Sequence, residues 1–329
     1  MTLPPASPRE PRPGAAPLRV GLLGAGRTRQ GLGPYLARAT AQAGARVVAI
    51  AGRERARCDT VARELAAQLG HPVVVADDAA ALARLVDALL IAAPVPGHLA
   101  GLEAALAAGI PCLCEKPLVG VADTALGIAC VERFRARSLL LVENCQWPFV
   151  LSAFGALYPE RRGRLVRQLA MGLGPGWPGP AMVVDSLSHV LSLLQALVPL
   201  PAGARAEQVE QDDPSPTATR NEVRFVVRGP AGATAVRLDL THCPAQPRPA
   251  WIEVDGARMD RRLGPDYAQS FARPDGRAEP VQDPLHQLVY GFFTDFHAGN
   301  RDRTEAHADA ILLRLRLYAD VLQQLGLDD

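Results

Sequence analysis

The 329-residue chain has no long apolar run, no excess of charge of either sign, and few aromatic residues. No stretch of about 18 uninterrupted apolar residues occurs, which argues against a membrane-spanning helix. Its 35 basic and 34 acidic residues leave a formal net charge of +1, which argues against a nucleic-acid binder dominated by phosphate contacts. We therefore expect neither a nucleic-acid partner nor a membrane partner.

The first 17 residues also lack an apolar segment and are rich in proline, alanine and charge. Residues 1–17 therefore match neither a secretory signal nor a twin-arginine signal. Their composition predicts a disordered tail. We expect the protein to be cytoplasmic.

Cysteine is too scattered to suggest a metal site. Only Cys112 and Cys114 lie close together, and no second pair completes a zinc site. We expect no metal, and we expect the cysteines to be small buried apolar side chains.

Lysine is nearly absent, because the 35 basic residues comprise Lys116 and 34 arginines. A guanidinium cannot release its proton under physiological conditions, whereas an ammonium can, and burial shifts its pKa readily. A chain that keeps one lysine among arginines is expected to need an amine there. The alternative is that compositional drift left one lysine by chance.

Residues 18–143 alternate between apolar strands and helices. This alternation predicts a doubly wound parallel sheet of Rossmann type, the architecture of a dinucleotide-binding domain. The expected strands are 18–23, 46–51, 73–75, 88–92, 112–114 and 138–142, and the expected helices are 34–43, 53–69, 79–85, 98–108 and 123–137.

Residues 144–329 have a different pattern, with alternating runs typical of half-buried antiparallel strands. These runs lie at 165–172, 222–227, 234–240 and 251–254, and a helix at 185–198 interrupts them. Two amphipathic helices close the chain, and connections rich in proline and glycine are expected at 172–180, 199–213 and 243–249. We predict an α+β domain with a mainly antiparallel open sheet, which binds substrate and forms oligomers.

The first strand runs into Gly24-Ala25-Gly26, which fits a phosphate-binding turn. Arg29 occupies the usual place of a third glycine. Pro34 favours the first helical turn, so the loop is expected to extend further and Gly31 to replace that glycine. The residues expected to bind a cofactor here are Gly24, Gly26, Arg27, Thr28, Arg29 and Gly31.

The second strand ends at Gly52, where a site for NAD usually has an acidic residue that binds the ribose 2′-hydroxyl. Arg53 and Arg57 are instead suited to a 2′-phosphate. We therefore predict that NADP is preferred over NAD. The alternative is that both arginines are solvated side chains of a helix.

Glu115-Lys116-Pro117 follows a strand, so it is expected at the carboxyl edge of the parallel sheet, where such folds bind ligands. Asp185 and His189 are four residues apart and share one face of a helix. A carboxylate beside an imidazole raises its basicity, which suits a proton acceptor. Alone, such a pair is more often a structural hydrogen bond; together with Lys116 it predicts a site between the domains.

These motifs give the chain a resemblance to a known family. Gly24-Ala25-Gly26, Ala93-Pro94-x-x-x-His98, Glu115-Lys116-Pro117 and Asp185-x-x-x-His189 occur in the order and at roughly the spacing of the Gfo/Idh/MocA oxidoreductases. The resemblance implies hydride transfer between NAD(P) and a carbinol or carbonyl carbon of a sugar, cyclitol or related polyol. It implies that Ala93, Pro94, His98 and Glu115 lie on the cofactor side.

The same resemblance implies the roles of the catalytic residues. Lys116 would hydrogen-bond the reacting oxygen, His189 would be the acid and base, and Asp185 would hold substrate hydroxyls or tune the histidine. Ser192 stands where polyol-binding members often have an acid. Gln146 and Trp147 are expected to replace it in binding substrate, with hinge packing as the alternative for Trp147.

Proteins resembling this one form dimers through the second-domain sheet, so we expect a homodimer or homotetramer. Two other functions fit the same motifs. One is a redox-assisted elimination or glycoside cleavage with a tightly bound cofactor, and the other is a non-catalytic cofactor-sensing protein.

Overall fold

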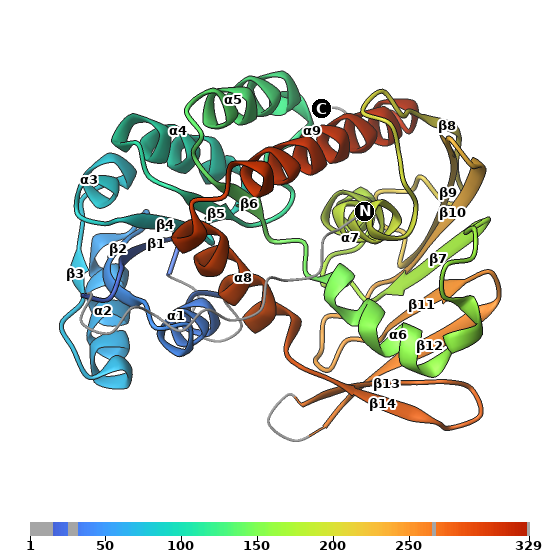
Figure 1. Ribbon diagram of the computed structural model, residues 1–329, viewed down its shortest axis with the longest axis horizontal. Coiled ribbons are helices and arrows are strands. Elements are labelled where there is room, and N and C mark those ends of the chain that lie inside the picture. The colour runs from blue at the N-terminus through green and yellow to red at the C-terminus, as the bar shows by residue number, and fades with distance from the viewer. Residues whose placement is uncertain (1–15, 26–31, 265–267, 328–329) are drawn as a thin grey trace. The chain divides into compact units, whose positions relative to one another are not determined.

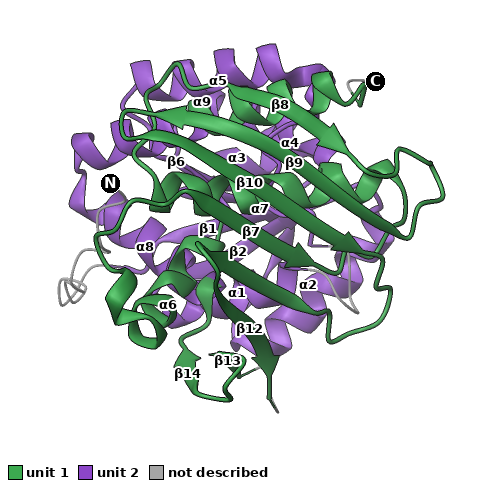
Figure 2. Cartoon of the chain, turned by 90° about the vertical axis from the view of Figure 1, so that its right-hand side faces the viewer, with its two compact units in different colours: residues 1–3, 145–284, 312–329 green, residues 4–144, 285–311 purple. Residues whose placement is uncertain are grey.

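The computed structural model describes residues 16–25, 32–264 and 268–327, so all but the last two residues of the predicted tail lie outside it. The chain divides into two compact units (Figure 2). We call the described residues of 16–144 and 285–311 the parallel-sheet unit. The described residues of 145–284 and 312–327 form the antiparallel-sheet unit.

The parallel-sheet unit contains a six-stranded sheet in the order β3-β2-β1-β4-β5-β6. Its strands are β1 (Arg19–Leu23), β2 (Arg46–Ala51), β3 (Val74–Val75), β4 (Ala88–Ile91), β5 (Cys112–Cys114) and β6 (Leu141–Glu143). All neighbouring pairs are parallel, which confirms the predicted Rossmann-type sheet. The strand order reverses between β1 and β4, and ligands of such sheets bind at this switch point.

Helices cover both faces of this sheet, with α1 and α2 on one side and α4 and α5 on the other (Figure 1). Their bounds are α1 (Leu32–Gln42), α2 (Arg55–Leu69), α3 (Ala79–Arg84), α4 (His98–Ala108) and α5 (Thr124–Ala136). Every residue of β4 and β5 is buried as a result. Helices α2 and α4 end at Gly70 and Gly109, whose left-handed backbone is the usual helix stop.

The sequence predicts that all residues after 144 form one domain, but the last two helices do not group in that way. Helix α8 (Pro284–Ala298) and the first half of α9 (Arg301–Gln324) group mainly with the parallel-sheet unit. Arg135 of α5 forms ion pairs with Glu305 and Asp309 of α9, which explains this grouping. An amphipathic pattern predicts a buried face but does not say which sheet covers it.

A buried carboxylate joins α8 to α9. Asp295 accepts hydrogen bonds from Arg303 at 2.7 Å and from His307 at 3.0 Å. Burial by itself raises the pKa of Asp295, but the hydrogen bonds from His307 and Arg303 outweigh it, so that the pKa lies below its usual value. The α8–α9 turn therefore has an internal ion pair shielded from solvent.

The antiparallel-sheet unit contains an eight-stranded sheet in the order β14-β13-β12-β11-β7-β10-β9-β8. Its strands are β7 (Gln168–Leu173), β8 (Ala206–Gln211), β9 (Arg220–Gly229), β10 (Gly232–Thr241), β11 (Ala250–Val254), β12 (Ala257–Leu263), β13 (Gln269–Ala272) and β14 (Ala278–Val281). Only β7 and β10 pair in parallel among these strands. The predicted mainly antiparallel sheet is thus confirmed.

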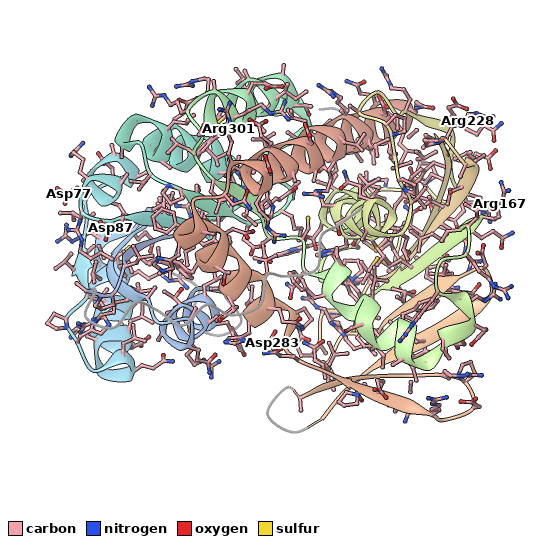
Figure 3. All side chains as sticks on the ribbon, viewed as in Figure 1. Asp77, Asp87, Arg167, Arg228, Asp283 and Arg301 are labelled. Carbon is pink, nitrogen blue, oxygen red and sulfur yellow. The ribbon has the colours of Figure 1, made fainter. Side chains whose placement is uncertain are left out.

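The prediction of a connection over residues 199–213 is wrong, because β8 lies there. It is an edge strand that carries Glu207 and Glu210, so it lacks the apolar alternation that reveals a strand. Glu207 accepts a hydrogen bond from Arg228 of β9 at 2.9 Å; Figure 3 labels Arg228. A charged edge strand of this kind discourages pairing with other chains.

Helix α7 (Pro180–Leu197) forms the core of this unit and lies behind the sheet in Figure 2. Its length and composition alone would allow it to cross a membrane, but more than half of it is buried inside the unit. On β9 the residues Val223, Phe225 and Val227 are buried, whereas Arg224 between them is exposed. The sheet therefore has an inner face against α7 and an outer face that is more polar.

The outer face has a tryptophan lying flat on the sheet. A Cβ on Gly172 would lie 2.0 Å from Nε1 of Trp251, so only glycine leaves room for the indole. The guanidinium of Arg258 lies 4.1 Å from the Trp251 ring centre, within cation–π range. Nearby, burial and then a hydrogen bond with Glu222 raise the pKa of Asp239 to about 6.

The six cysteines are free thiols, as expected from their scattered positions. Five are buried, and Cys243 is half-buried. Burial is the largest cause that raises the pKa of Cys114 well above its usual value, which makes the thiol unreactive. These thiols act as small apolar side chains.

Candidate functional site

The turn after β1 contains the best-defined glycine of the predicted cofactor loop. Gly24 has a φ of +91°, and a Cβ there would lie 2.3 Å from the backbone nitrogen of Ala93. Its own N–H donates to the carbonyl oxygen of Ala51 at 2.9 Å. Both the backbone angle and the contact therefore require glycine. The other predicted loop residues, Gly26, Arg27, Thr28, Arg29 and Gly31, lie outside the described residues.

Gly33, which we expected at the end of the glycine loop, lies in α1 and brings that helix close to this turn. A Cβ on Gly33 would lie 3.1 Å from Cα of Ala25. Close packing of the first helix is the role usually given to the third glycine of the dinucleotide fingerprint. The position of Gly33 at the start of a helix, directly after the glycine-rich segment, could have indicated this packing role.

The end of β2 leaves little space for an acidic side chain. A Cβ on Gly52 would already lie 2.9 Å from Sγ of Cys58. Arg53 is exposed and has no ion pair within the described part of the chain. Arg55, by contrast, pairs with Asp59 and with Asp77, which Figure 3 labels.

His98 joins the loop after β4 to the loop after β5. Its Nε2 lies 2.8 Å from the carbonyl oxygen of Ala93, and its Nδ1 lies 3.0 Å from that of Pro117. The side chain is buried at 1% exposure. Ala93 is half-buried and Pro94 is exposed. The ring of His98 thus holds two loops in place at the carboxyl edge of the sheet.

Glu115 and Lys116 follow β5 at this edge. Glu115 is buried and accepts a hydrogen bond from the amide of Asn144, while its own N–H donates to Ile91 at 2.9 Å. Lys116 is half-buried, and its peptide bond to Pro117 is cis. The structure therefore gives Glu115 an internal partner in addition to its predicted place beside the cofactor.

Two further polar residues at this edge were missed from the sequence. Glu143 of β6 accepts a hydrogen bond from the N–H of Leu118 at 3.0 Å, two residues after Lys116. Asn144 follows it and donates to Glu115 as described above. Both lie at the carboxyl end of a parallel strand, and this position in the sequence could have marked them as residues of the site.

The remaining predicted residues lie in the antiparallel-sheet unit. Gly179 has a φ of +70°, and a Cβ there would lie 2.1 Å from the carbonyl oxygen of Pro216, so the chain can enter α7 only through glycine. Asp185 and His189 lie one turn apart on α7, and both are half-buried. This arrangement agrees with their predicted common helix face.

Trp147 packs beside His189. The two ring centres lie 6.2 Å apart with an edge contact, and Phe271 lies 6.3 Å from Trp147 on another side. Trp147 is 7% exposed, so most of its indole serves packing. Gln146, immediately before it, is half-buried.

Comparison with known proteins identifies the first domain. Residues 18–139 match the family model for Gfo/Idh/MocA oxidoreductases with an NAD-binding Rossmann fold. These residues, about a third of the chain, are therefore similar to the NAD-binding domain of that family. This confirms the resemblance seen in the motifs.

Curated relatives match part of this chain. An inositol 2-dehydrogenase from Streptomyces avermitilis is 32% identical over 209 residues, which cover 60% of this chain and 58% of the relative. A D-apiose dehydrogenase from Paraburkholderia graminis is 27% identical over 225 residues, covering 63% and 59%. The chain thus spans somewhat less than three fifths of the length of these relatives.

Solved structures with the same fold match nearly the whole chain. A myo-inositol dehydrogenase from Corynebacterium glutamicum has a TM-score of 0.66 at 19% identity, covering 94% of this chain and 98% of that one. A UDP-N-acetylglucosamine 3-dehydrogenase from Acidithiobacillus ferrooxidans has a TM-score of 0.65 at 20% identity, covering 94% and 99%. These similarities show that the chain has a known fold.

Replacing Gly24 by alanine should destabilise the protein far more than replacing Gly70. Both glycines have a positive φ, but a Cβ on Gly70 meets nothing within 4 Å, whereas one on Gly24 meets the backbone of Ala93. We expect Gly70→Ala to cost about 1 kcal/mol of unfolding free energy and Gly24→Ala about 3 kcal/mol or more. Denaturant unfolding measures both, and equal losses would contradict the importance of the backbone contact.

Proposed function

We propose that the protein is an NAD(P)-dependent oxidoreductase acting on a sugar, cyclitol or related polyol. It would transfer a hydride between the nicotinamide and a carbinol or carbonyl carbon of the substrate. The observation that carries this proposal is the position of Lys116, the only lysine, at the carboxyl edge of a family Rossmann sheet. The inositol and D-apiose dehydrogenases among the relatives support the substrate class.

The described residues fit a dinucleotide at the switch point of the parallel sheet. The absent side chain of Gly24 lets the turn after β1 approach the backbone of Ala93 after β4, and Gly33 packs α1 against the same turn. Residues of the loop from Gly24 to Gly33 would hold the pyrophosphate, with Ala93 and Pro94 towards the nicotinamide. When bound, the cofactor supplies the carbon that accepts or donates the hydride.

The protein's own side chains would manage charge and protons on the reacting oxygen. The ammonium of Lys116 would donate a hydrogen bond to that oxygen and stabilise its alkoxide character. His189 would take or return the proton, with Asp185 one turn away on α7 to hold substrate hydroxyls or tune the imidazole. Gln146 and Trp147 would contact the substrate. The proposal requires Lys116 and His189 to act on the same substrate molecule.

A preference for NADP follows from the end of β2. With no acid at Gly52 and an exposed Arg53, a 2′-phosphate meets a cation, whereas a 2′-hydroxyl meets no carboxylate. NADP(H) should bind more tightly than NAD(H), and Arg53→Ala should remove the difference. Arg63→Ala, at a position on α2 ten residues after Arg53, is the control and should leave it unchanged. Calorimetric titration tests this, and tenfold tighter binding of NAD(H) would overturn the preference.

We further propose a homodimer or homotetramer formed through the outer face of the antiparallel sheet. Trp251 and the paired charges near it, such as Arg258 and the Arg224–Glu222 ion pair, support this. Together they form a mixed apolar and charged surface against which a second copy of the chain can pack. Light scattering should give at least twice the chain mass of 35.0 kDa. Arg237→Glu should weaken assembly, and a 35 kDa particle for the unmodified protein at micromolar concentration would refute it.

Substitution of Lys116 tests the chemistry directly. Lys116→Ala removes the donor, and Lys116→Arg keeps the charge but adds bulk and fixes the proton. Both should lower turnover on an active polyol at least roughly 10²-fold, as loss of a transition-state donor does. NAD(P) affinity should change far less, because the pyrophosphate is held at the glycine loop.

Formation of reduced nicotinamide, measured across a panel of sugars and cyclitols, gives the turnover. Calorimetric titration of the same variants gives the cofactor affinity. Turnover of Lys116→Arg at the level of the unmodified protein would mean that the single lysine is an accident of composition.

A further inference from the structure

Arg261 lies on the inner face of the antiparallel sheet. Along β12, Met259 is fully buried on that face, and Arg261 follows two residues later. Arg261 is the register partner of Phe271, which is also fully buried. Asp260 and Arg262 point to the other face, because side chains alternate along a strand. The guanidinium of Arg261 is thus directed to the side of the sheet that α7 covers.

Among the described residues, this guanidinium has no acidic partner. One of its nitrogens donates to the carbonyl oxygen of Arg248 at 2.7 Å, while Nε is buried without a hydrogen-bond acceptor. Within residues 16–25, 32–264 and 268–327, no carboxylate forms an ion pair with Arg261. Burial lowers the pKa of Arg261, and no neighbouring acid offsets this. By contrast, Asp260 raises the pKa of Arg258 on the same strand.

Arg261 is half-buried, and a cation partly withdrawn from water is stabilised when a counterion or another acceptor lies nearby. Trp147 supplies part of the compensation, since its ring centre lies 5.8 Å from the Arg261 guanidinium. A cation–π contact at that distance leaves the Nε–H without an acceptor. An oxygen acceptor would satisfy this N–H, and a negatively charged one would also supply a counterion.

The surroundings link Arg261 to the proposed site. Trp147 contacts both Arg261 and His189, the proposed acid and base. Asp185 contributes the carboxylate of the proposed site on α7. Arg261 comes from strand β12 of the sheet, whereas Asp185 and His189 come from the helix.

We propose that Arg261 binds a carboxylate or phosphate group of the substrate, so that the protein acts on an acidic sugar derivative rather than on a neutral polyol. This inference rests on the proposed function and narrows its substrate class. An oxyanion would accept hydrogen bonds from the Nε–H and a terminal N–H of the guanidinium fork and would neutralise the buried charge. A neutral polyol would leave that charge uncompensated.

Binding to matched ligands tests the proposal. Each set contains a hexose, its uronic acid and its 6-phosphate, in the gluco, galacto and manno series, titrated with NAD(P) present. At least one anionic ligand should bind about tenfold or more tightly than its neutral match, which corresponds to about 1.4 kcal/mol. The uronic acid and phosphate arms show which oxyanion is recognised.

Arg261→Met keeps much of the side-chain volume and removes the charge, so it should abolish the preference for the anion. Arg261→Lys keeps the charge without the fork and should retain part of the preference. Arg262→Met is the matched control, because Arg262 is the next residue on β12 and is exposed. The control should bind all three ligands of a set as the unmodified protein does.

Equal binding of anionic and neutral ligands to the unmodified protein, or an absence of binding by every anionic ligand, would overturn the inference. So would an anion preference that persists in Arg261→Met. If Arg261→Met does not fold, as judged by circular dichroism, Arg261→Lys decides the matter, and an unchanged preference ratio for that variant is the overturning result.

The two proposals fail in different ways. Hydride transfer on neutral polyols that does not depend on Arg261 would leave the proposed function standing and refute the acidic substrate. Anion binding that depends on Arg261, without turnover of any ligand, would support the anion site and refute the dehydrogenase.

Discussion

The candidate site depends on one backbone contact, the approach of the turn after β1 to the end of β4. At Gly24 this approach leaves no room for a Cβ, because Ala93 lies 2.3 Å from where it would stand. The contact joins the two strands at which the sheet order reverses, so it shapes the crevice where such sheets bind ligands. His98 then ties the loop of Ala93 to the loop that carries Lys116.

Polar groups buried at the carboxyl edge hold the Lys116 loop from the other side. Glu143 accepts from the backbone just beyond Lys116, and Asn144 donates to Glu115 just before it. Buried carboxylates are retained when their oxygens are hydrogen-bonded, and both acids meet that condition. The half-buried amine is therefore carried by a loop whose neighbours have fixed partners, which suits a side chain that must meet a reacting oxygen.

The antiparallel sheet separates two kinds of chemistry on its two faces. Its outer face pairs arginines with acids around Trp251, so nearly every cation there has a nearby carboxylate. Its inner face holds Trp147 and Phe271 together with an arginine that has no carboxylate partner in the described residues. Side chains alternate along β12, so the consecutive residues Asp260 and Arg261 point to opposite faces of the sheet. This alternation explains the difference between the two faces.

Much of the parallel-sheet unit follows from local pattern. The bounds of β2, β5 and α4 agree with the expectation from apolar runs and periodicity, because buried parallel strands and their helices carry strong signals. Edge strand β8 was missed because its charged residues hide the alternation. The grouping of the first half of α9 with the parallel sheet could not be foreseen, since it depends on contacts between residues more than 150 positions apart, such as Arg135 with Asp309.

The sequence by itself determined the glycine turn, the single amine after a parallel strand, and the spacing of Asp185 and His189 on one helix. Each of these depends on residues close together in the chain, where backbone sterics and helical period decide the outcome. Only the tertiary structure decided that His98 joins two loops, that Gly33 packs α1, and that Arg261 is half-buried with no acid paired to it among the described residues. Those features depend on which distant groups meet a side chain, and no local pattern records that.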